Sequence, residues 1–557
     1  MDPQIKCQTQ PIAIPRPAQS TFYLCEKPSQ ARTLARLLGA GKCPDGMHAG
    51  PGVVVGHAFG HLLNLAMPEE YVGSGKWSLH NLPILPANWV WQVAERHRDQ
   101  FDQIGRYLKT ADAVVIATDP DEEGEVIARQ ILHGHGYTGP VSRLWVSALD
   151  PASLATALQN LLPLSATEGC YRAGRVRHEM DWLFGMNLSR AFSVIFNRPT
   201  PIGRVKTRLL NELVKRDREI WQFVPVSYHT ACVDIEDTVL AWQPGRGAIQ
   251  HDAGLPSLAQ VDSGVCLSSE IYREALPPPL PYTLSALLAD ASEMGMLLAN
   301  AYAATQQLYE SGAISYPRTG STTLPGAHAG GFAAHHAIVN TKDSCPDRMT
   351  EEAKQVFDLV QLNGVYQQLG PAAINVRRLL FEFGGELFCA TDRWLGSPDS
   401  AGWLLGMPDR DGARVDSPNA SLFKAGDTVH ATIRVERKES APPDSFTEAS
   451  LLRLMDKAGM GTEATRVAAI GRLVRDKVAE TTGQTDHHGM VLKKPPVIRS
   501  TRLGRERIQN LPDAVCGPTM ENRLQRALDA ARGGQPDASG HLLEAAKWIA
   551  QTIRGPA

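Results

Sequence analysis

The segment ATDPDEEGE at residues 117–125 places five carboxylates in seven consecutive positions: Asp119, Asp121, Glu122, Glu123 and Glu125. Charges this close repel one another unless a positive group lies among them. Asp119, Asp121 and Glu123 occupy alternate positions where an apolar, strand-like run ends. Carboxylates in such a place suit Mg²⁺, which prefers hard oxygen ligands. We therefore predict a Mg²⁺ site, although Glu122 and Glu125 also fit an acid-rich helix N-terminus.

Two other short stretches carry groups that suit phosphate chemistry. Glu26 and Lys27 end the first strand-like run; the carboxylate could join the metal site, and the lysine could hold a phosphate or protonate a leaving oxygen. Further on, Tyr316 precedes a rigid proline and then Arg318, a side chain that can clamp a phosphate in bidentate fashion. Each signal is weak alone, since most tyrosines only pack.

His335 and His336 are adjacent, and zinc ligation is one interpretation of the pair. The nine cysteines include no C-x-x-C pair, which argues against a zinc ribbon and against a disulfide framework. We expect reduced thiols and a cytosolic protein.

The net charge of −3 does not by itself indicate a nucleic-acid partner, but residues 196–219 are locally basic. Seven arginines and lysines there face three acidic residues, and more arginines lie just upstream. A solvated helical face and a polyanion-binding surface both fit this run.

The elements that must position these groups change along the chain. Strand-like and helical runs alternate from residue 21 to about 163, which indicates an α/β sheet that is largely parallel. We predict a flexible extension (1–20) and an α/β domain (21–163), followed by two helical segments (164–223 and 444–557), two strand-rich segments (224–280 and 373–443) and a helical domain (281–372) that carries Tyr316. Ser445 and Glu448 are expected to form a capping box. No run reaches the length of a membrane helix.

Six motifs, taken together and in order, resemble the motif series of type IA DNA topoisomerases, with topoisomerase III as the closest branch. They are EKPS (26–29), DPDEEGE (119–125), GRV (203–205), YPRT (316–319), HHAI (335–338) and GTEATR (461–466). The resemblance covers residues 21 to about 510. It implies a multidomain fold in which a Rossmann-like Toprim domain is joined to a toroidal, helix-rich clamp that also contains strands.

The resemblance also implies a reaction. Tyr316 would attack a DNA phosphodiester, giving a 5′-phosphotyrosyl link and a free 3′-OH. Another strand would pass through the gap before resealing, so that negative supercoils are relaxed or DNA is decatenated. Because the phosphotyrosine stores the bond energy, no ATP is needed, and the chain has no G-x-x-x-x-G-K-[ST] motif.

By the same resemblance, site residues can be assigned. The catalytic residues are Tyr316, Glu26, Lys27, Arg318 and His335; the Mg²⁺ ligands are Glu26, Asp119, Asp121 and Glu123; and the DNA-binding residues are Arg177, Gly203, Arg204, Val205, Lys206, Thr465 and Arg466. The partner is single-stranded or negatively supercoiled DNA. We expect a nucleoid-associated cytoplasmic monomer without membrane contact, recruited by a protein that the sequence does not identify.

Departures from the family pattern leave two alternatives. Glu122 stands where the family usually has arginine, so the acidic run is expected to lose a positive neighbour and to be more crowded; Pro201 and Lys206 also differ. A Toprim-type nuclease would keep the acidic cluster but would not need Tyr316. An inactive DNA-binding scaffold would tolerate loss of site residues, yet none is lost.

Overall fold

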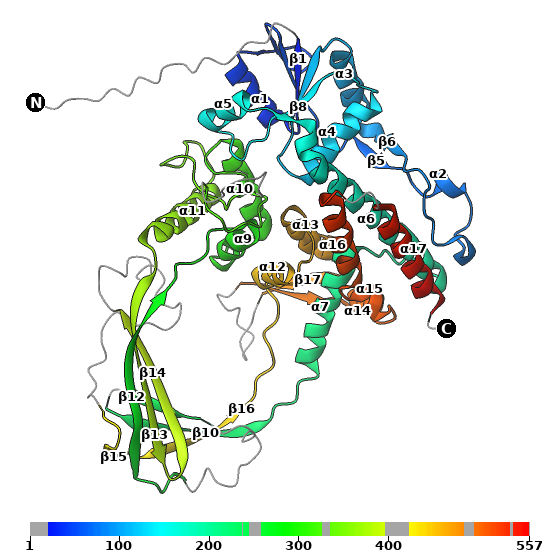
Figure 1. Cartoon of the computed structure of the whole chain (residues 1–557). Coiled ribbons are helices and arrows are strands. Elements are labelled where there is room, and N and C mark those ends of the chain that lie inside the picture. Colours follow the sequence, from blue (N-terminus) through cyan, green and yellow to red (C-terminus); the bar gives the residue numbers. More distant parts are fainter. Residues whose placement is uncertain are drawn as a thin grey trace, which may run out of the picture. The chain divides into compact units, whose positions relative to one another are not determined.

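The computed structural model describes residues 20–236, 238–243, 258–325, 335–395, 423–483, 495–534 and 538–555. Apart from residue 20, the predicted N-terminal extension lies outside these ranges. The chain divides into two compact units (Figure 1). One combines residues 1–215, 282–358 and 446–557, and the other combines 216–281 with 359–445. The finer division into domains stays a prediction.

A seven-stranded sheet lies at the N-terminal end of the first unit. In spatial order its strands are β2 (Gly41–Lys42), β3 (His48–Gly50), β4 (Val53–His57), β1 (Thr21–Cys25), β7 (Ala113–Ala117), β8 (Val141–Arg143) and β9 (Leu162–Pro163). The central strands β4, β1, β7 and β8 are parallel, and the edge pairs are antiparallel. The helices of this region are α1 (Pro28–Leu38), α2 (Glu69–Val72), α3 (Arg98–Leu108), α4 (Glu122–Gly134) and α5 (Pro151–Gln159), and a small sheet pairs β5 (Leu63–Leu65) with β6 (Trp91–Val93). The predicted N-terminal α/β sheet is confirmed.

Local chemistry explains where the elements beside the site begin. All five residues of β1 are buried, as expected for a central parallel strand covered on both faces. Pro28 occupies the first position of α1, where its missing amide hydrogen costs nothing. Helix α4 begins after Asp121, whose Oδ1 accepts a hydrogen bond from the Gly124 amide at 2.7 Å. A Cβ at Gly124 would lie 2.1 Å from the Asp119 carbonyl oxygen, so only glycine allows this close start.

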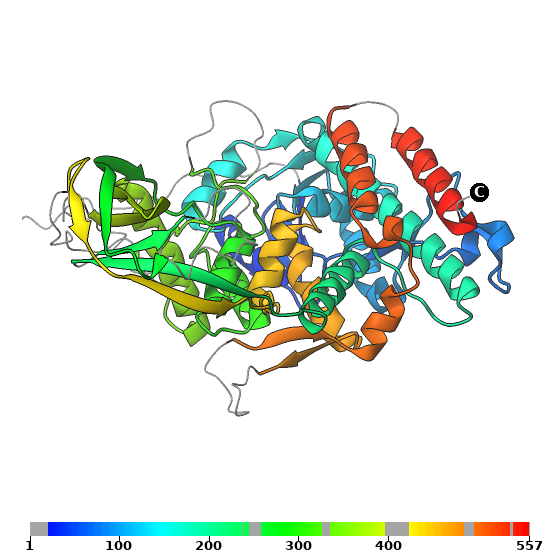
Figure 2. The ribbon, with the colours of Figure 1, turned by 90° about the horizontal axis from the view of Figure 1, so that it is seen from below.

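The rest of the first unit is mainly helical. Its elements are α6 (Glu168–Ile195), α7 (Arg204–Trp221), α9 (Leu284–Glu293), α10 (Leu298–Glu310), α11 (Glu351–Leu369), α12 (Glu448–Lys457), α13 (Glu463–Arg475), α14 (Arg502–Ile508), α15 (Asp513–Cys516), α16 (Thr519–Arg532) and α17 (Ala538–Arg554), with a hairpin of β17 (Ala479–Thr482) and β18 (Val497–Ser500). Helices α7 and α11 end in the second unit. Helix α6 packs against α4, α16 and α17 (Figure 2). Gly174 permits its approach to α4, because a Cβ there would meet the Glu122 carbonyl oxygen at 2.6 Å.

The second unit is built on an antiparallel seven-stranded sheet. Its strands are, in spatial order, β15 (Thr428–His430), β12 (Ser263–Leu276), β13 (Ala372–Phe383), β14 (Glu386–Leu395), β11 (Thr238–Trp242), β10 (Ser227–Ile235) and β16 (Ile433–Glu439). Strands from both of its chain segments are interleaved in this order, and Phe381, Phe383 and Phe388 lie in its core. The chain therefore leaves this sheet, forms α9 and α10 in the first unit, and returns to complete it.

One local prediction is wrong. The N-cap of α12 is Thr447, and its hydroxyl and that of Ser450 form the capping box; Ser445 and Glu448 do not. The helix begins later than expected because Phe446 is buried and Thr447 forms a β-bridge with Val497, which keeps the chain extended up to this point. In the part of the chain that the structure describes, no helix is long and apolar enough to cross a membrane.

Candidate active site

The two strand ends that carry carboxylates are neighbours. Strands β1 and β7 run parallel with Cys25 opposite Ala117, so the residues that follow them meet at one edge of the sheet. The Asp119 carboxylate is fully buried there, and its Oδ2 lies 3.0 Å from the Lys27 amino nitrogen. The structure thus brings together groups that are 92 residues apart in the chain.

Arg318 approaches the same carboxylates from the segment that follows α10. Its guanidinium lies 3.4 Å from Asp119 Oδ2 and 3.9 Å from Glu26 Oε1, and Lys27 lies 3.9 Å from the same Glu26 oxygen. Burial alone would lower the pKa of Arg318, but its neighbours Tyr316, Asp119 and Glu26 outweigh burial and raise the pKa, which keeps the charge fixed. A lysine and an arginine beside two carboxylates provide positive charge where a phosphate could bind.

The buried carboxylates still carry excess negative charge. Burial and the neighbouring Asp119 raise the pKa of Glu26 to about 8, and the same two causes raise the pKa of Asp121. Glu26 Oε2 is buried and has no hydrogen-bond partner within the described residues. Three mutually repelling oxygen ligands, one of them unsatisfied, fit a hard divalent cation. The residues present are therefore suited to Mg²⁺.

Tyr316 lies directly against this cluster. Its hydroxyl donates a hydrogen bond to Asp121 Oδ2 at 2.5 Å, and its backbone amide donates to the Ser147 carbonyl at 2.6 Å. The side chain is buried, and burial together with the charges of Asp121 and Asp119 raises its pKa well above the usual value. A phenol with a raised pKa stays protonated, so it needs a base close by in order to act as a nucleophile. Asp121 is in position to serve as that base.

Of the two adjacent histidines, His335 faces the tyrosine. Its ring centroid lies 4.5 Å from that of Tyr316, and its other side stacks on Trp145. Burial lowers the pKa of His335 to about 4, so the imidazole is neutral near pH 7. His336 instead hydrogen-bonds through Nδ1 to the Ala337 carbonyl.

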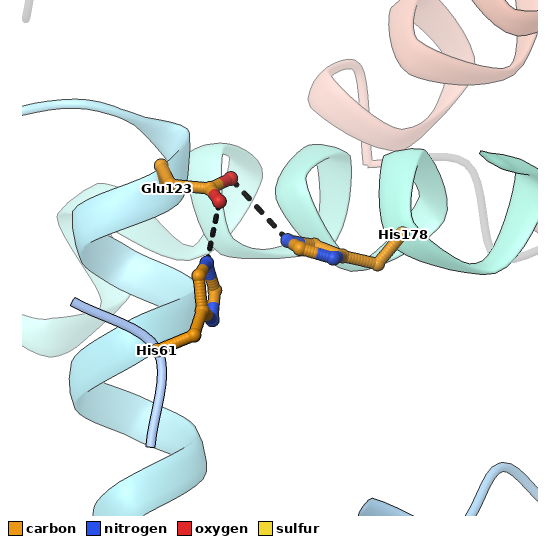
Figure 3. Close-up of side chains that lie close together, drawn as sticks. All are labelled: His61, Glu123 and His178. Atoms are coloured by element: carbon orange, nitrogen blue, oxygen red, sulfur yellow. Dashed lines mark hydrogen bonds and ion pairs between the residues drawn. The ribbon is translucent and has the colours of Figure 1, made fainter. Parts of the chain in front are cut away.

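Glu123 does not join the other three predicted metal ligands. Its carboxylate contacts His61 Nε2 and lies 3.3 Å from His178 Nε2 (Figure 3). Burial alone would raise the pKa of Glu123, but the hydrogen bonds from His178 and His61 outweigh it and lower the pKa. Among the described residues, these three side chains are the only group of three or more potential metal ligands whose donor atoms all lie within 4.8 Å of one another. Sequence analysis missed both histidines, because neither stands in a recognisable ligand spacing.

The other two acids of the run are neutralised by arginines. Glu122 pairs with Arg177 at 2.5 Å and with Arg532 at 2.6 Å, so distant arginines compensate for the positive neighbour that the run itself lacks. The compensating charges come from α6 and α16, which the local sequence does not reveal. Glu125 is fully buried and pairs with Arg143 at 2.5 Å and with Arg129 at 3.0 Å. The positive groups that this run requires are therefore mostly arginines.

One cavity borders the cluster, and a second cavity shares lining residues with the first. The first, about 460 Å³, is lined by Asp121, Glu122, Glu123, Arg177, His178, Asp181, Tyr302, Arg318, Thr462, Glu463, Ala464 and Thr465. The second, about 290 Å³, is lined by Asp181, Gly203, Arg204, Val205, Lys206, Thr465, Ala468, Ala469 and Arg472. Asp181 and Thr465 line both. Six of the seven predicted DNA-binding residues thus line these two neighbouring cavities.

All four basic side chains among the predicted DNA-binding residues already have acidic partners, and that of Arg177 is Glu122. Lys206 pairs with Asp476. Arg204 is buried between Asp181, at 2.7 Å, and Glu521, at 2.9 Å. Arg466, the seventh predicted DNA-binding residue, lies outside both linings. It is buried and bonds to Ser285 Oγ, Asp456 and Glu463, an arrangement that holds α13 against α9 and α12.

Family comparisons match this arrangement along most of the chain. A family model described as the Toprim domain matches residues 21–149, and one described as DNA topoisomerase matches residues 165–331 and 327–535. The chain belongs to the type IA DNA topoisomerase family.

Curated relatives of this topoisomerase are similar over most of their length. DNA topoisomerase 3 of Bacillus subtilis is 26% identical over 96% of this chain and 81% of its own length. DNA topoisomerase 3 of Salmonella typhimurium is 27% identical over 91% of this chain and 89% of its own. The full-length topoisomerase I structure from Thermotoga maritima superposes with a TM-score of 0.74 at 20% identity, covering 96% of this chain and 91% of that one, and so shares the fold.

The topoisomerase is accordingly an enzyme with type IA, topoisomerase III-like activity, and DNA is its substrate. Its Toprim domain is of a kind that generally binds a divalent metal. The predicted family, fold class and activity are confirmed. The roles of individual residues, the identity of the metal and the form of DNA bound stay predictions.

Proposed function

We propose that this topoisomerase cleaves one DNA strand through Tyr316, with Mg²⁺ as its cofactor, and reseals it after strand passage. The observation that carries the proposal is the 2.5 Å hydrogen bond from the Tyr316 hydroxyl to Asp121, beside Arg318. This bond links a nucleophile to a base at the edge of the acidic cluster, where Lys27 and Arg318 supply positive charge. Attack on a phosphodiester requires a nucleophile, a base and positive charge in this arrangement.

In the proposed cleavage step the Tyr316 oxygen attacks the phosphorus and the bond from phosphorus to the 3′-oxygen breaks. Asp121 accepts the phenol proton at Oδ2, the oxygen to which the Tyr316 hydroxyl already donates. Lys27 gives a proton to the departing 3′-oxygen, which becomes a free 3′-OH. The phosphate is then bonded to the Tyr316 oxygen and to the 5′-oxygen of the downstream fragment, and resealing reverses each transfer.

The remaining groups bind and orient. Arg318 would meet the charge that develops on the phosphate. His335 supplies a neutral imidazole that packs against Tyr316 and fixes its ring. Glu26, Asp119 and Asp121 would hold Mg²⁺, which when bound polarises a phosphate oxygen and helps to place the 3′-OH. Glu123 would have to leave its histidines to join them.

The two neighbouring cavities beside the acidic cluster are the proposed site for single-stranded or negatively supercoiled DNA. Their lining residues Arg177 and Lys206 would meet phosphates, while Arg466 positions the helix that carries Thr465. The enzyme is proposed to act as a monomer. A DNA substrate and bacterial relatives support a nucleoid-associated, cytoplasmic enzyme that relaxes or decatenates DNA.

End-labelled single-stranded oligonucleotides test the polarity of the proposed linkage. After denaturation, the label from a 3′-labelled oligonucleotide is expected to migrate with the protein, because the fragment carrying the 5′-phosphate is attached to Tyr316. The 5′-labelled fragment is expected to be free and to end in a 3′-OH that a polymerase can extend. Protein on the 5′-labelled fragment would contradict the proposal, and two free fragments would indicate a nuclease.

Lys206→Ala is expected to weaken binding of single-stranded DNA and to lower the slope of log affinity against log salt by about 0.7, the loss of one phosphate contact. Asp476→Asn should have the opposite effect on affinity, because it releases Lys206 from its ion pair. Lys354→Ala, an exposed lysine that lines neither cavity, is the control. Fluorescence anisotropy at several salt concentrations measures all three, and an unchanged slope for Lys206→Ala would remove this residue from the DNA site.

A further inference from the structure

Two imidazoles and a carboxylate from three separate elements converge on one point beside the acidic cluster. His61 lies in the loop between β4 and β5, Glu123 in the first turn of α4 and His178 on α6. Both histidines direct Nε2 at the same Glu123 carboxylate (Figure 3). All three donor atoms lie within 4.8 Å of one another.

The surrounding rings fix this arrangement and leave it accessible. His61 and His178 contact edge to face with their centroids 4.9 Å apart, and Trp91 contacts His178 at 5.6 Å. All three ligand side chains are partly exposed, and Glu123 and His178 also line the 460 Å³ cavity. An ion can therefore reach the three donor atoms without opening the protein core.

We propose that His61, Glu123 and His178 form a binding site for a divalent transition metal of the zinc and cobalt class, separate from the Mg²⁺ carboxylates. Imidazole suits zinc-like metals, whereas Mg²⁺ prefers oxygen ligands alone. In a tetrahedral site, bonds of about 2.0–2.2 Å to zinc place two ligands about 3.3–3.6 Å apart, so adjustments on the order of 1 Å in partly exposed side chains complete the site. Three protein ligands leave the fourth coordination position of the metal open toward the cavity.

The site has a consequence for Glu123. A metal ion there holds this carboxylate with the two histidines and links the Toprim sheet to α6, so that Glu123 is withheld from the Asp119 cluster. The proposal does not depend on the cleavage chemistry, because none of its three ligands touches Tyr316 in the structure.

Cobalt is a spectroscopic probe for such a site. The full-length, untagged enzyme, freed of metal by a chelator, is titrated with Co²⁺ and followed by visible d–d absorption; Zn²⁺ is then added in competition. We expect one equivalent of Co²⁺ per chain with a low-symmetry, intense spectrum, its displacement by Zn²⁺, and no displacement by a large excess of Mg²⁺. Displacement by Mg²⁺ would overturn the proposal, because it would place the ion on carboxylates alone.

Variants decide which residues hold the ion. His61→Ala and His178→Ala are each expected to weaken Co²⁺ binding by at least about 10–100-fold. The matched control is His133→Ala, an exposed histidine on α4, the helix that carries Glu123. Retention of the spectrum in both ligand variants would overturn the proposal.

If circular dichroism shows that either variant misfolds, Glu123→Gln replaces it, with the same expected loss of Co²⁺ binding. Tyr316→Phe should keep the Co²⁺ site, so failure of the cleavage proposal and failure of this one are distinguishable.

Discussion

Tyr316→Phe is expected to abolish plasmid relaxation, with a fall in rate of at least about 10⁴-fold, and to abolish the covalent protein–DNA adduct. The change removes one oxygen, the atom that would form the bond to phosphorus. That oxygen is buried against Asp121. Among the described residues, no other tyrosine hydroxyl donates a hydrogen bond to this carboxylate. Relaxation of negatively supercoiled plasmid with Mg²⁺, stopped with denaturant to trap the adduct, measures both losses.

The matched control is Tyr309→Phe. Tyr309 is the other buried tyrosine beside the cluster, and its ring centroid lies 5.5 Å from that of Tyr316. This variant loses the same atom from a neighbouring ring, so it should still form the adduct. Adduct formation that persists in Tyr316→Phe would exclude Tyr316 as the nucleophile. Nicking without an adduct in both variants would favour a Toprim-type nuclease, and DNA binding without nicking in the wild type would favour a scaffold.

Arg143→Met is expected to lower the free energy of unfolding of the first unit by about 3–5 kcal/mol, since it leaves the Glu125 carboxylate buried without its main partner. Arg143 is fully buried, pairs with Glu125 at 2.5 Å, and also donates to the carbonyls of Thr118 and Asp119. The variant therefore also loosens the backbone that carries the catalytic aspartates. Urea denaturation and hydrogen exchange of the β7 and α4 amides measure the effect.

Two comparisons separate the buried ion pair from a general loss of arginine. Arg106→Met removes an exposed arginine from α3 and should change stability by no more than about 0.5 kcal/mol. Combining Arg143→Met with Glu125→Leu should recover much of the lost free energy of unfolding, because an apolar pair of similar volume can replace a buried ion pair. An Arg143→Met protein as stable as the wild type would show that Glu125 does not need this partner.

Local sequence was sufficient for several parts of the fold and site. The apolar run that became β7 and the helix signals after it predicted where Asp119 and Asp121 stand. Pro28 correctly indicated the first turn of α1. The capping box of α12 was misplaced, because a tertiary contact, the bridge from Thr447 to Val497, shifts the start of that helix. Local propensity is reliable only where no distant segment pairs with the same residues.

The sequence by itself determined the family, the parallel sheet and the convergence of two strand ends, because motif order and strand periodicity are written in consecutive residues. Only the tertiary structure decided which partner each charged group has. Tyr316 reaches Asp121 across 195 residues, and Glu122 finds Arg532 across 410. Glu123 pairs with histidines and not with the neighbouring aspartates, because the first turn of a helix points successive side chains in different directions and distant elements supply what each one meets.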